Sequence, residues 1–327
     1  MSKFAAALVI VCACFAAEGS ARAEPPAPVW AYPVNPPDFK PSPDDGQLRH
    51  VPDSSLAYSV AQTRDLFFAP DWHPDDHPAM PEIVARGNKP AVFACGFCHR
   101  ADGAGGPENA ALAGLSAAYI IRQMADFKNG SRKTAVAERV PPRLMIKLAM
   151  AASDEEVQAA AAYFSALKPK SIIRIVETDT VPETFVAGWF LADSNSGKKE
   201  PIGSRIIEVP EDLAQFENRD ARARFIAYVP IDSVRKGEAL ATKGVGTLAV
   251  QCAACHGPGL TGMIDVPRLA GRSPSYLVRQ LTDFKHGART GSGSELMKPV
   301  VEALTLEDMV NLAAYAASLP VEKAAPK

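Results

Sequence analysis

The chain has 327 residues, a length that suits two or three domains. Lys and Arg total 35 and Asp and Glu total 37, so the formal net charge is −2 and no basic excess indicates a nucleic-acid partner. The charges form no long run that would predict a solvating tail.

The first 23 residues have the features of a secretory signal peptide. Lys3 precedes an apolar run over 4–17, and an A-x-A cleavage motif stands at 21–23. A retained anchor helix is one alternative, but the apolar run is short for a membrane span. A lipoprotein acylated on Cys12 or Cys14 is another, but the residues around both cysteines fit that reading poorly. We expect cleavage directly after the A-x-A motif.

Residues 24–80 form a proline-rich N-terminal extension. We expect it to run as an extended segment over the unit that follows. His73 and His77 flank a proline-rich turn near its end, and we expect both side chains to be exposed in a loop.

Two segments of the chain are copies of one unit. At an offset of 157 positions, eight of the fourteen residues at 119–132 are identical to those at 276–289. Each copy also contains the motif C-x-x-C-H, as CGFCH at 95–99 and CAACH at 252–256. Such gapless agreement does not arise by chance, so the two segments are expected to share one fold.

Both units are predicted to be small and helical, over 81–168 and 233–320. The quartets that begin at Ser153 and Thr305 place an acid three residues after a hydroxyl, which is typical of a helix N-terminus. A further helix is expected to lead into each motif, from Pro81 and from Ser233. The remaining expected helices are 116–128, 154–166, 274–285 and 306–318.

The segment between the units, 169–232, has a different pattern. β-branched and aromatic residues cluster in short runs between Gly, Pro, Asn and Ser, which predicts three or four strands. Turns are expected near 194–197 and 210–212, and 321–327 form a short tail. The predicted fold class is therefore mainly α, with two helical units in tandem and a β-rich insert between them.

The C-x-x-C-H motif is typical of covalent attachment of c-type haem. Two cysteines three residues apart lie on one side of a helical turn, where their thiols can add to the two vinyl groups of a porphyrin. The histidine that follows can then bind the iron. We expect two haem c groups with iron, attached at Cys95, Cys98, Cys252 and Cys255 and ligated by His99 and His256.

Three other uses of the cysteines are weaker. A zinc site would combine two cysteine pairs that lie far apart, each within its own repeat. A redox dithiol needs one copy and a βαβ setting. A disulfide within each motif would leave both histidines without a role.

The second axial ligand is predicted to be methionine. A thioether ligand would raise the reduction potential and close the iron to substrate. Met145 and Met297 match between the two copies, once five extra residues in the first copy are allowed for. Met150 and Met263 are the fallback ligands, and core packing is the alternative role for all of them. His73 or His77 as a distal ligand is a minor alternative.

Residues around the haem can also be proposed. The carbonyl of Pro267 is an acceptor candidate for His256, with Ala110 at the matching position of the first copy. The matched tyrosines and phenylalanines are expected in the core or against the haem: Tyr119, Tyr276, Phe127 and Phe284. Four arginines could pair with haem propionates or lie on a solvated helix face: Arg122, Arg279, Arg132 and Arg289.

With these motifs, the chain resembles the di-haem c-type cytochromes of the cytochrome c4 family. The residues that carry the resemblance are CGFCH, CAACH, the shared Y-x-x-R-Q-x-x-D-F-K-x-G-x-R stretch, Met145 and Met297. The resemblance covers about 81–168 and 233–320 and implies two class I cytochrome c domains, His/Met ligation and a periplasmic location. The insert and the N-terminal extension depart from the family pattern, which leaves its close two-fold packing an open question for this chain.

The function predicted from the sequence is electron transfer between periplasmic or membrane-bound redox proteins, without enzymatic activity or a small-molecule substrate. A cytochrome subunit of a periplasmic dehydrogenase complex is the first alternative. A di-haem enzyme is the second: a peroxidase would need His73 or His77 at the iron, and a thiosulfate dehydrogenase would need a further cysteine.

Overall fold

The computed structural model describes residues 26–244 and 250–321. The expected signal peptide at 1–23 lies outside these residues. The N-terminal extension contains short elements only, which are η1 (Val29–Ala31), β1 (Leu48–Arg49), β2 (Tyr58–Ser59), α1 (Val60–Arg64) and η2 (Pro74–Asp76).

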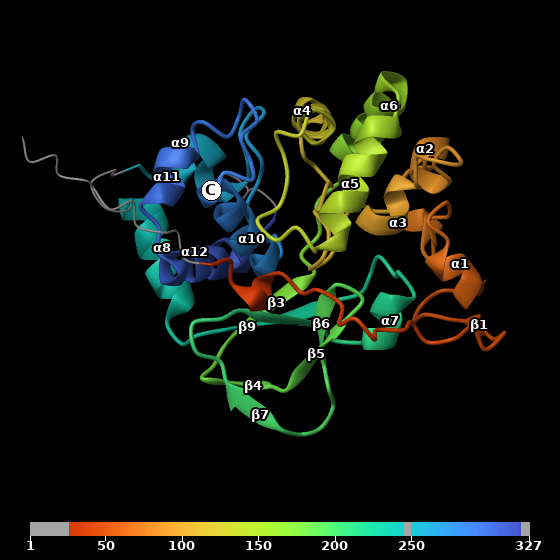
Figure 1. Ribbon diagram of the computed structural model, residues 1–327, viewed down its shortest axis with the longest axis horizontal. Helices are drawn as coiled ribbons and strands as arrows, with labels where there is room; N and C mark the ends of the chain where they lie inside the picture. The colour runs from red at the N-terminus through yellow and green to blue at the C-terminus, as the bar shows by residue number, and fades with distance from the viewer. Residues whose placement is uncertain (1–25, 245–249, 322–327) are drawn as a thin grey trace, which may run out of the picture.

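In Figure 1 two helical units lie next to each other above a region of strands. The first contains α2 (Glu82–Ala85), α3 (Cys95–His99), α4 (Ala117–Lys128), α5 (Val140–Ala151) and α6 (Asp154–Ala166). The second contains α8 (Ser233–Lys243), α9 (Ala253–His256), η3 (Pro258–Leu260), α10 (Pro274–Lys285), α11 (Lys298–Glu302) and α12 (Leu306–Ser318). The four long helices expected from the repeats are thus present within one residue of the expected bounds.

The last helix of each unit begins at a capping box. In α6, Glu156 N donates to Ser153 Oγ at 3.2 Å, and Ser153 N donates to Glu156 Oε2 at 2.8 Å. Thr305 and Asp308 make the same reciprocal pair at the start of α12. These bonds satisfy backbone donors that the first helical turn leaves free, so the predicted N-termini are confirmed.

Seven short strands and one helix lie between the two units. They are β3 (Ile173–Glu177), β4 (Thr180–Pro182), β5 (Thr184–Ala187), β6 (Phe190–Asp193), β7 (Lys199–Pro201), β8 (Ile207–Pro210), α7 (Leu213–Glu217) and β9 (Phe225–Val229). β9 lies between β3, to which it is parallel, and β8, to which it is antiparallel. The sequence pattern predicted fewer strands because the hairpin β5–β6 divides one apolar run in two, and because β7 has the sequence KEP and lacks an apolar pattern.

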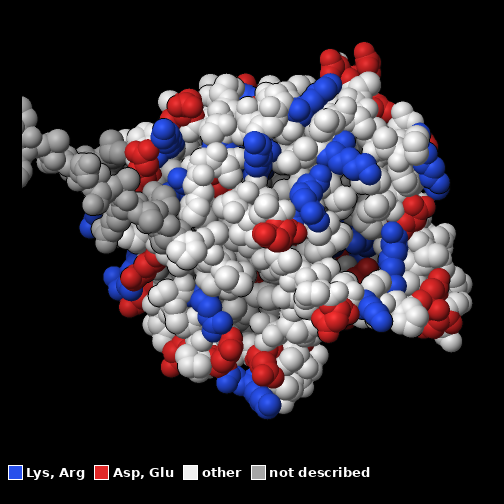
Figure 2. Space-filling view, in the orientation of Figure 1, with Lys and Arg blue, Asp and Glu red and all other residues white. Residues whose placement is uncertain are grey.

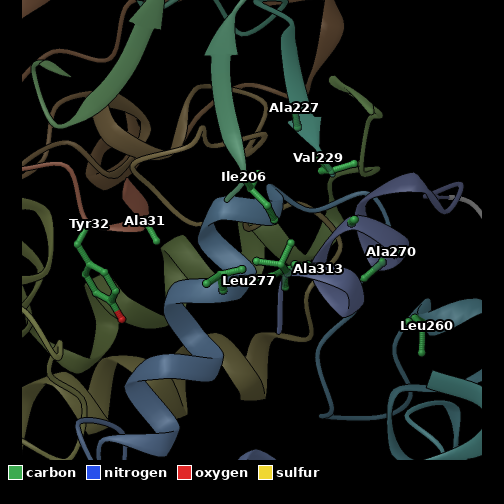
Figure 3. Packing of buried hydrophobic residues seen from close by; sticks show 13 residues of the cluster. Ala31, Tyr32, Ile206, Ala227, Val229, Leu260, Ala270, Leu277 and Ala313 are labelled. Atoms are coloured by element: carbon green, nitrogen blue, oxygen red, sulfur yellow. The ribbon is translucent and has the colours of Figure 1, made fainter. Parts of the chain in front are cut away.

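The sequence led us to expect that the N-terminal extension runs over the first unit, but part of it packs against the second unit. Tyr32 is buried against the second unit, where its hydroxyl donates to Asp283 Oδ1 at 2.8 Å. Figure 3 shows Ala31 and Tyr32 on one side of the same apolar cluster as Leu277 and Ala313 of the second unit. Apolar burial decides this course, because proline content predicts an extended chain but not its docking surface.

The two units meet through matching residues. Lys133 N donates to Ala288 O at 2.7 Å, and Thr290 N donates to Ser131 O at 2.7 Å. Arg132 and Arg289 form an antiparallel bridge between these bonds. Residues related by the repeat thus pair with each other, so a local two-fold contact is present despite the intervening strands.

None of the helices that the structure describes has the length and apolar character needed to cross a membrane. On the face shown in Figure 2, Lys and Arg alternate with Asp and Glu over a mostly uncharged surface. This distribution agrees with the nearly neutral net charge.

The crossing of α8 and α12 yields a stability prediction. A Cβ atom at Gly237 would meet Asn311 O at 2.0 Å and Tyr315 Cβ at 2.7 Å, so Gly237→Ala should force the helices apart. We expect the free energy of unfolding to fall by about 1–3 kcal/mol, as for other overpacked cores. Guanidinium unfolding followed by circular dichroism measures it.

Glu238→Ala is the matched control, because Glu238 is the exposed neighbour on α8. Its effect should stay within about 0.5 kcal/mol. Equal effects of the two substitutions would contradict the close helix contact.

Candidate haem sites

Each C-x-x-C-H motif forms one short helix, α3 or α9, with its histidine at the C-terminal end. The chain then turns sharply through a residue of positive φ, which is Arg100 (φ 68°) in the first motif and Gly257 (φ 76°) in the second. A non-glycine residue is strained in this region, so the first motif maintains the same turn at a conformational cost.

The histidines are held by equivalent hydrogen bonds. His99 Nδ1 lies 2.8 Å from Ala110 O, and His256 Nδ1 lies 2.8 Å from Pro267 O. A carbonyl only accepts, so Nδ1 donates in both cases and Nε2 of the neutral ring keeps its lone pair for a ligand. Both acceptors that the sequence suggested are confirmed.

Burial keeps both imidazoles neutral. It lowers the pKa of His99 to about 4, and it also lowers the pKa of His256. Because a metal binds the neutral ring, these histidines are ready to bind iron at neutral pH.

A cavity lies beside each motif. Cys95, Cys98, His99 and Met145 line the first cavity, which contains about 1540 Å³ of unfilled space including the part open to solvent. The second contains about 2090 Å³ on the same measure and is lined by Cys252, Cys255, His256 and Met297. Each cavity therefore lies directly beside the two cysteines and the histidine to which a haem would be attached.

The methionines come from different local structures. Met145 lies in the second turn of α5, whereas Met297 is the N-cap of the short helix α11. Met150 is 66 % exposed and does not line the first cavity. Met263 does line the second cavity, so it stays the alternative to Met297 there.

The expected exposure of His73 and His77 is wrong. His73 Nε2 lies 3.1 Å from Asp220 Oδ1, and both side chains are buried. His77 Nε2 lies 3.1 Å from Asp71 Oδ1, and Tyr163 Oη lies 3.0 Å from His77 Nδ1. Neither histidine lines either cavity, and the ring nitrogens of His77 contact Asp71 and Tyr163 instead.

Arginines outnumber carboxylates in both cavity linings. The second cavity has four arginines against Asp265, and the first has four against Glu108, Glu156 and Asp283. Desolvation lowers the pKa of the buried guanidinium of Arg139 and that of Arg279, which line the first cavity. A buried cation requires an anionic partner, so these linings suit a group with carboxylates such as the haem propionates.

The arginines of α4 and α10 reach across the domain contact. Arg122 belongs to the first unit but lines the second cavity, where its Nη2 donates to Asp265 O at 3.0 Å. Arg279 belongs to the second unit but lines the first cavity. Five residues line both cavities, which therefore share a wall: Tyr119, Gln123, Arg272, Tyr276 and Gln280.

Trp189 and Arg139 also line the first cavity, and the sequence did not identify either. Trp189 lies in the turn between β5 and β6 with a positive φ of 83°. Neither residue has a functional counterpart in the repeat, so alignment of the two copies gives no signal for them.

The structure disfavours a zinc or dithiol site. Over residues 26–244 and 250–321, no three His, Cys, Asp or Glu side chains lie close enough to bind one ion. Burial raises the pKa of the Cys95 thiol to about 12 and also raises that of Cys98 and of Cys252. Thiols with raised pKa values are poor nucleophiles and poor redox centres.

Comparison with known proteins decides the family. Residues 84–168 match the family described as cytochrome c, and residues 239–315 match cytochrome c oxidase, cbb3-type, subunit III. Cytochrome c-554(548) of Halomonas halodenitrificans is 37 % identical over 68 residues, which are 20 % of this chain and 82 % of the relative. The chain belongs to the c-type cytochromes.

Two longer relatives align with both units of this di-haem cytochrome. The thiosulfate dehydrogenase electron acceptor of Stutzerimonas stutzeri is 28 % identical over 239 residues, 71 % of this chain and 82 % of the relative. Cytochrome c4 of Azotobacter vinelandii is 26 % identical over 243 residues, 72 % of this chain and 89 % of the relative. The resemblance to the cytochrome c4 family is confirmed.

The shared wall of the cytochrome can be tested by substitution. Gln123 Oε1 accepts from Arg132 Nη1 at 2.9 Å and from Arg289 Nη2 at 2.7 Å. Gln123→Ala removes one acceptor from each guanidinium and should lower the free energy of unfolding by about 1.5–3 kcal/mol. Denaturant unfolding of the holoprotein measures the loss.

Gln158→Ala serves as the control, because Gln158 is exposed on α6. A change within about 0.5 kcal/mol is expected there. If Gln123→Ala were equally mild, the hydrogen bonds across the domain contact would not stabilise the fold.

Proposed function

We propose that this protein is a periplasmic electron carrier with two covalent haems, each ligated by histidine and methionine. The first haem is attached at Cys95 and Cys98 with ligands His99 and Met145. The second is attached at Cys252 and Cys255 with ligands His256 and Met297. One geometric fact supports this most: in each cavity, an imidazole with a free Nε2 and a methionine line the same space.

The proposed architecture is two class I cytochrome c domains in tandem, 81–168 and 233–320, separated by a β-rich insert at 169–232. A signal peptide over 1–23 and the extension 24–80 precede them, and 321–327 form the tail. An exported protein meets an oxidising compartment, where free thiols tend to pair. Attachment of haem through thioethers would use all four cysteines that follow the signal peptide.

The haem iron supplies a one-electron couple, and the protein residues determine how that couple behaves. The carbonyls of Ala110 and Pro267 orient the imidazoles and raise their basicity through Nδ1. Met145 and Met297 would each hold the iron through a thioether, a ligand that raises the potential and closes the iron to substrate. The apolar linings exclude water, and the arginines balance the propionate charge.

A second candidate is a cytochrome subunit that accepts electrons from a periplasmic dehydrogenase. Similarity to the thiosulfate dehydrogenase electron acceptor of Stutzerimonas stutzeri favours this reading. A relative from Thiomonas intermedia has the same name and is 28 % identical over 236 residues. The partner in either case is a redox protein, without a small-molecule substrate or nucleic acid.

A peroxidase is the least supported of the three functions. Its distal histidine would have to come from His73 or His77, whose nitrogens contact Asp220, Asp71 and Tyr163. Neither side chain is available to reach the iron without breaking these contacts.

Ligation can be tested at each methionine. We expect Met145→Ala and Met297→Ala each to remove about half of the near-infrared thioether-to-iron band of the ferric protein and to lower the potential of one haem. Met150→Ala is the control and should leave band and potential unchanged, because Met150 points to solvent. An intact band in either ligand variant would refute that ligand.

A free carrier and a subunit differ in whether the protein stays bound to its redox partner. A stable subunit should co-purify with a dehydrogenase from the native periplasm in constant stoichiometry through size-exclusion chromatography. A free carrier should elute alone, and it should still accept electrons from the dehydrogenase fraction when the two are mixed.

A further inference from the structure

The two motifs have the same local structure but different surroundings. Phe97, one residue before the second cysteine of the first motif, is 2 % exposed, whereas its counterpart Ala254 is exposed. Cys98 is half-buried and Cys255 is exposed. The difference continues beyond the motif, since residues 101 and 102 are buried and the matching Pro258 and Gly259 are exposed.

Two segments, 65–80 of the extension and 212–222 of the insert, cover the first motif, and we call them the cap. Ala94 N donates to Leu66 O at 2.9 Å, and Leu66, Ala69 and Met80 pack on Phe97 and Cys98. From the other side, the Arg219 guanidinium lies 4.0 Å from the centre of the Phe97 ring. In Figure 1, α7 and the N-terminal segment lie on the side of α3, while α9 lies at the far end of the molecule.

The cap lies close against α3. A Cβ atom at Gly96 would meet Ala69 Cβ at 2.9 Å and Val84 O at 3.0 Å, whereas the matching residue of the second motif is Ala253. The glycine thus permits an approach that the second motif does not need.

The two parts of the cap are joined to each other. Trp72 Nε1 donates to Asn218 O at 2.8 Å, and Arg222 donates to both oxygens of Asp76 at 2.8 Å. The buried pair of His73 and Asp220 completes the contact. These contacts hold the cap over the outer side of α3, next to Phe97 and Cys98.

We propose that electrons enter and leave this protein only at the second haem, while the first haem exchanges electrons only with the second. The proposal rests on the proposed function, because it requires two redox-active haems. Electron tunnelling rates fall steeply with distance, so the cap separates a partner's cofactor from the thioether edge of the first haem. The wall shared by both cavities leaves the route between the haems short.

Oxidation of the reduced holoprotein by ferricyanide tests this route. Each ferrous haem loses one electron to become ferric, and each ferricyanide gains one to become ferrocyanide, so one chain consumes two ferricyanide ions. A redox titration first counts the haems. The proposed function requires two redox-active haems per chain. Once the titration has found both, the kinetics test only the route of the electrons.

The variants Ala254→Lys and Ala254→Glu place opposite charges at the exposed second motif. The matched controls are Ala151→Lys and Ala151→Glu, at an exposed site that ends α5 of the first unit. In stopped flow at about 0.1 M ionic strength, Ala254→Lys should speed and Ala254→Glu should slow the reaction with this anion by about threefold each. The Ala151 variants should change the rate by less than about 1.5-fold, because their charge lies on α5 of the first unit and not beside the second motif.

The whole absorbance change decides the outcome. The proposal is supported if both electrons respond to the charge at position 254, or if the second electron leaves at a rate independent of ferricyanide concentration. It is overturned if half of the absorbance change remains proportional to ferricyanide concentration and indifferent to position 254. A response to the Ala151 variants equal to that at position 254 would also overturn it.

Discussion

The hydrogen bond from each motif histidine to a carbonyl eleven residues later determines the geometry of both haem sites. It connects α3 to Ala110 and α9 to Pro267, so the loop after each motif is tied to the ring that it orients. Without it, the imidazole could rotate or present the wrong nitrogen. The burial that lowers the pKa of both rings acts with this bond, because a neutral ring has one donor and one acceptor.

The contact between the units depends on residues that the repeat supplies twice. Gln123 and Gln280 each accept from both Arg132 and Arg289, so four side chains form a closed, two-fold set. Cations packed this closely repel each other, and the neutral amide acceptors together with the phenol oxygen of Tyr276 make the arrangement tolerable. The same side chains separate the two cavities, which links domain packing to the route between haems.

The non-repeated segments make the two sites unequal. The extension contributes Tyr32 to the second unit and the apolar residues around Leu66 to the first. The insert contributes Trp189 to the lining of the first cavity and Arg219 to the cover of Phe97. Duplication therefore accounts for two similar haem sites, and the added segments account for the difference in access between them.

The sequence alone predicted the motifs, the repeat, the starts of the long helices and the carbonyl partners of the histidines. All of these depend on local chemistry or on comparing one copy with the other. It also allowed Met145 and Met297 to be selected, since only they match between copies.

Only the tertiary structure decided which element lies against which. The burial of His73 and His77, the crossing of Arg122 and Arg279 to the opposite cavities, and the role of Trp189 depend on contacts between residues far apart in the chain. Such contacts arise from three-dimensional packing of apolar surface and from pairing of buried charge, and neither leaves a periodic pattern in a single sequence.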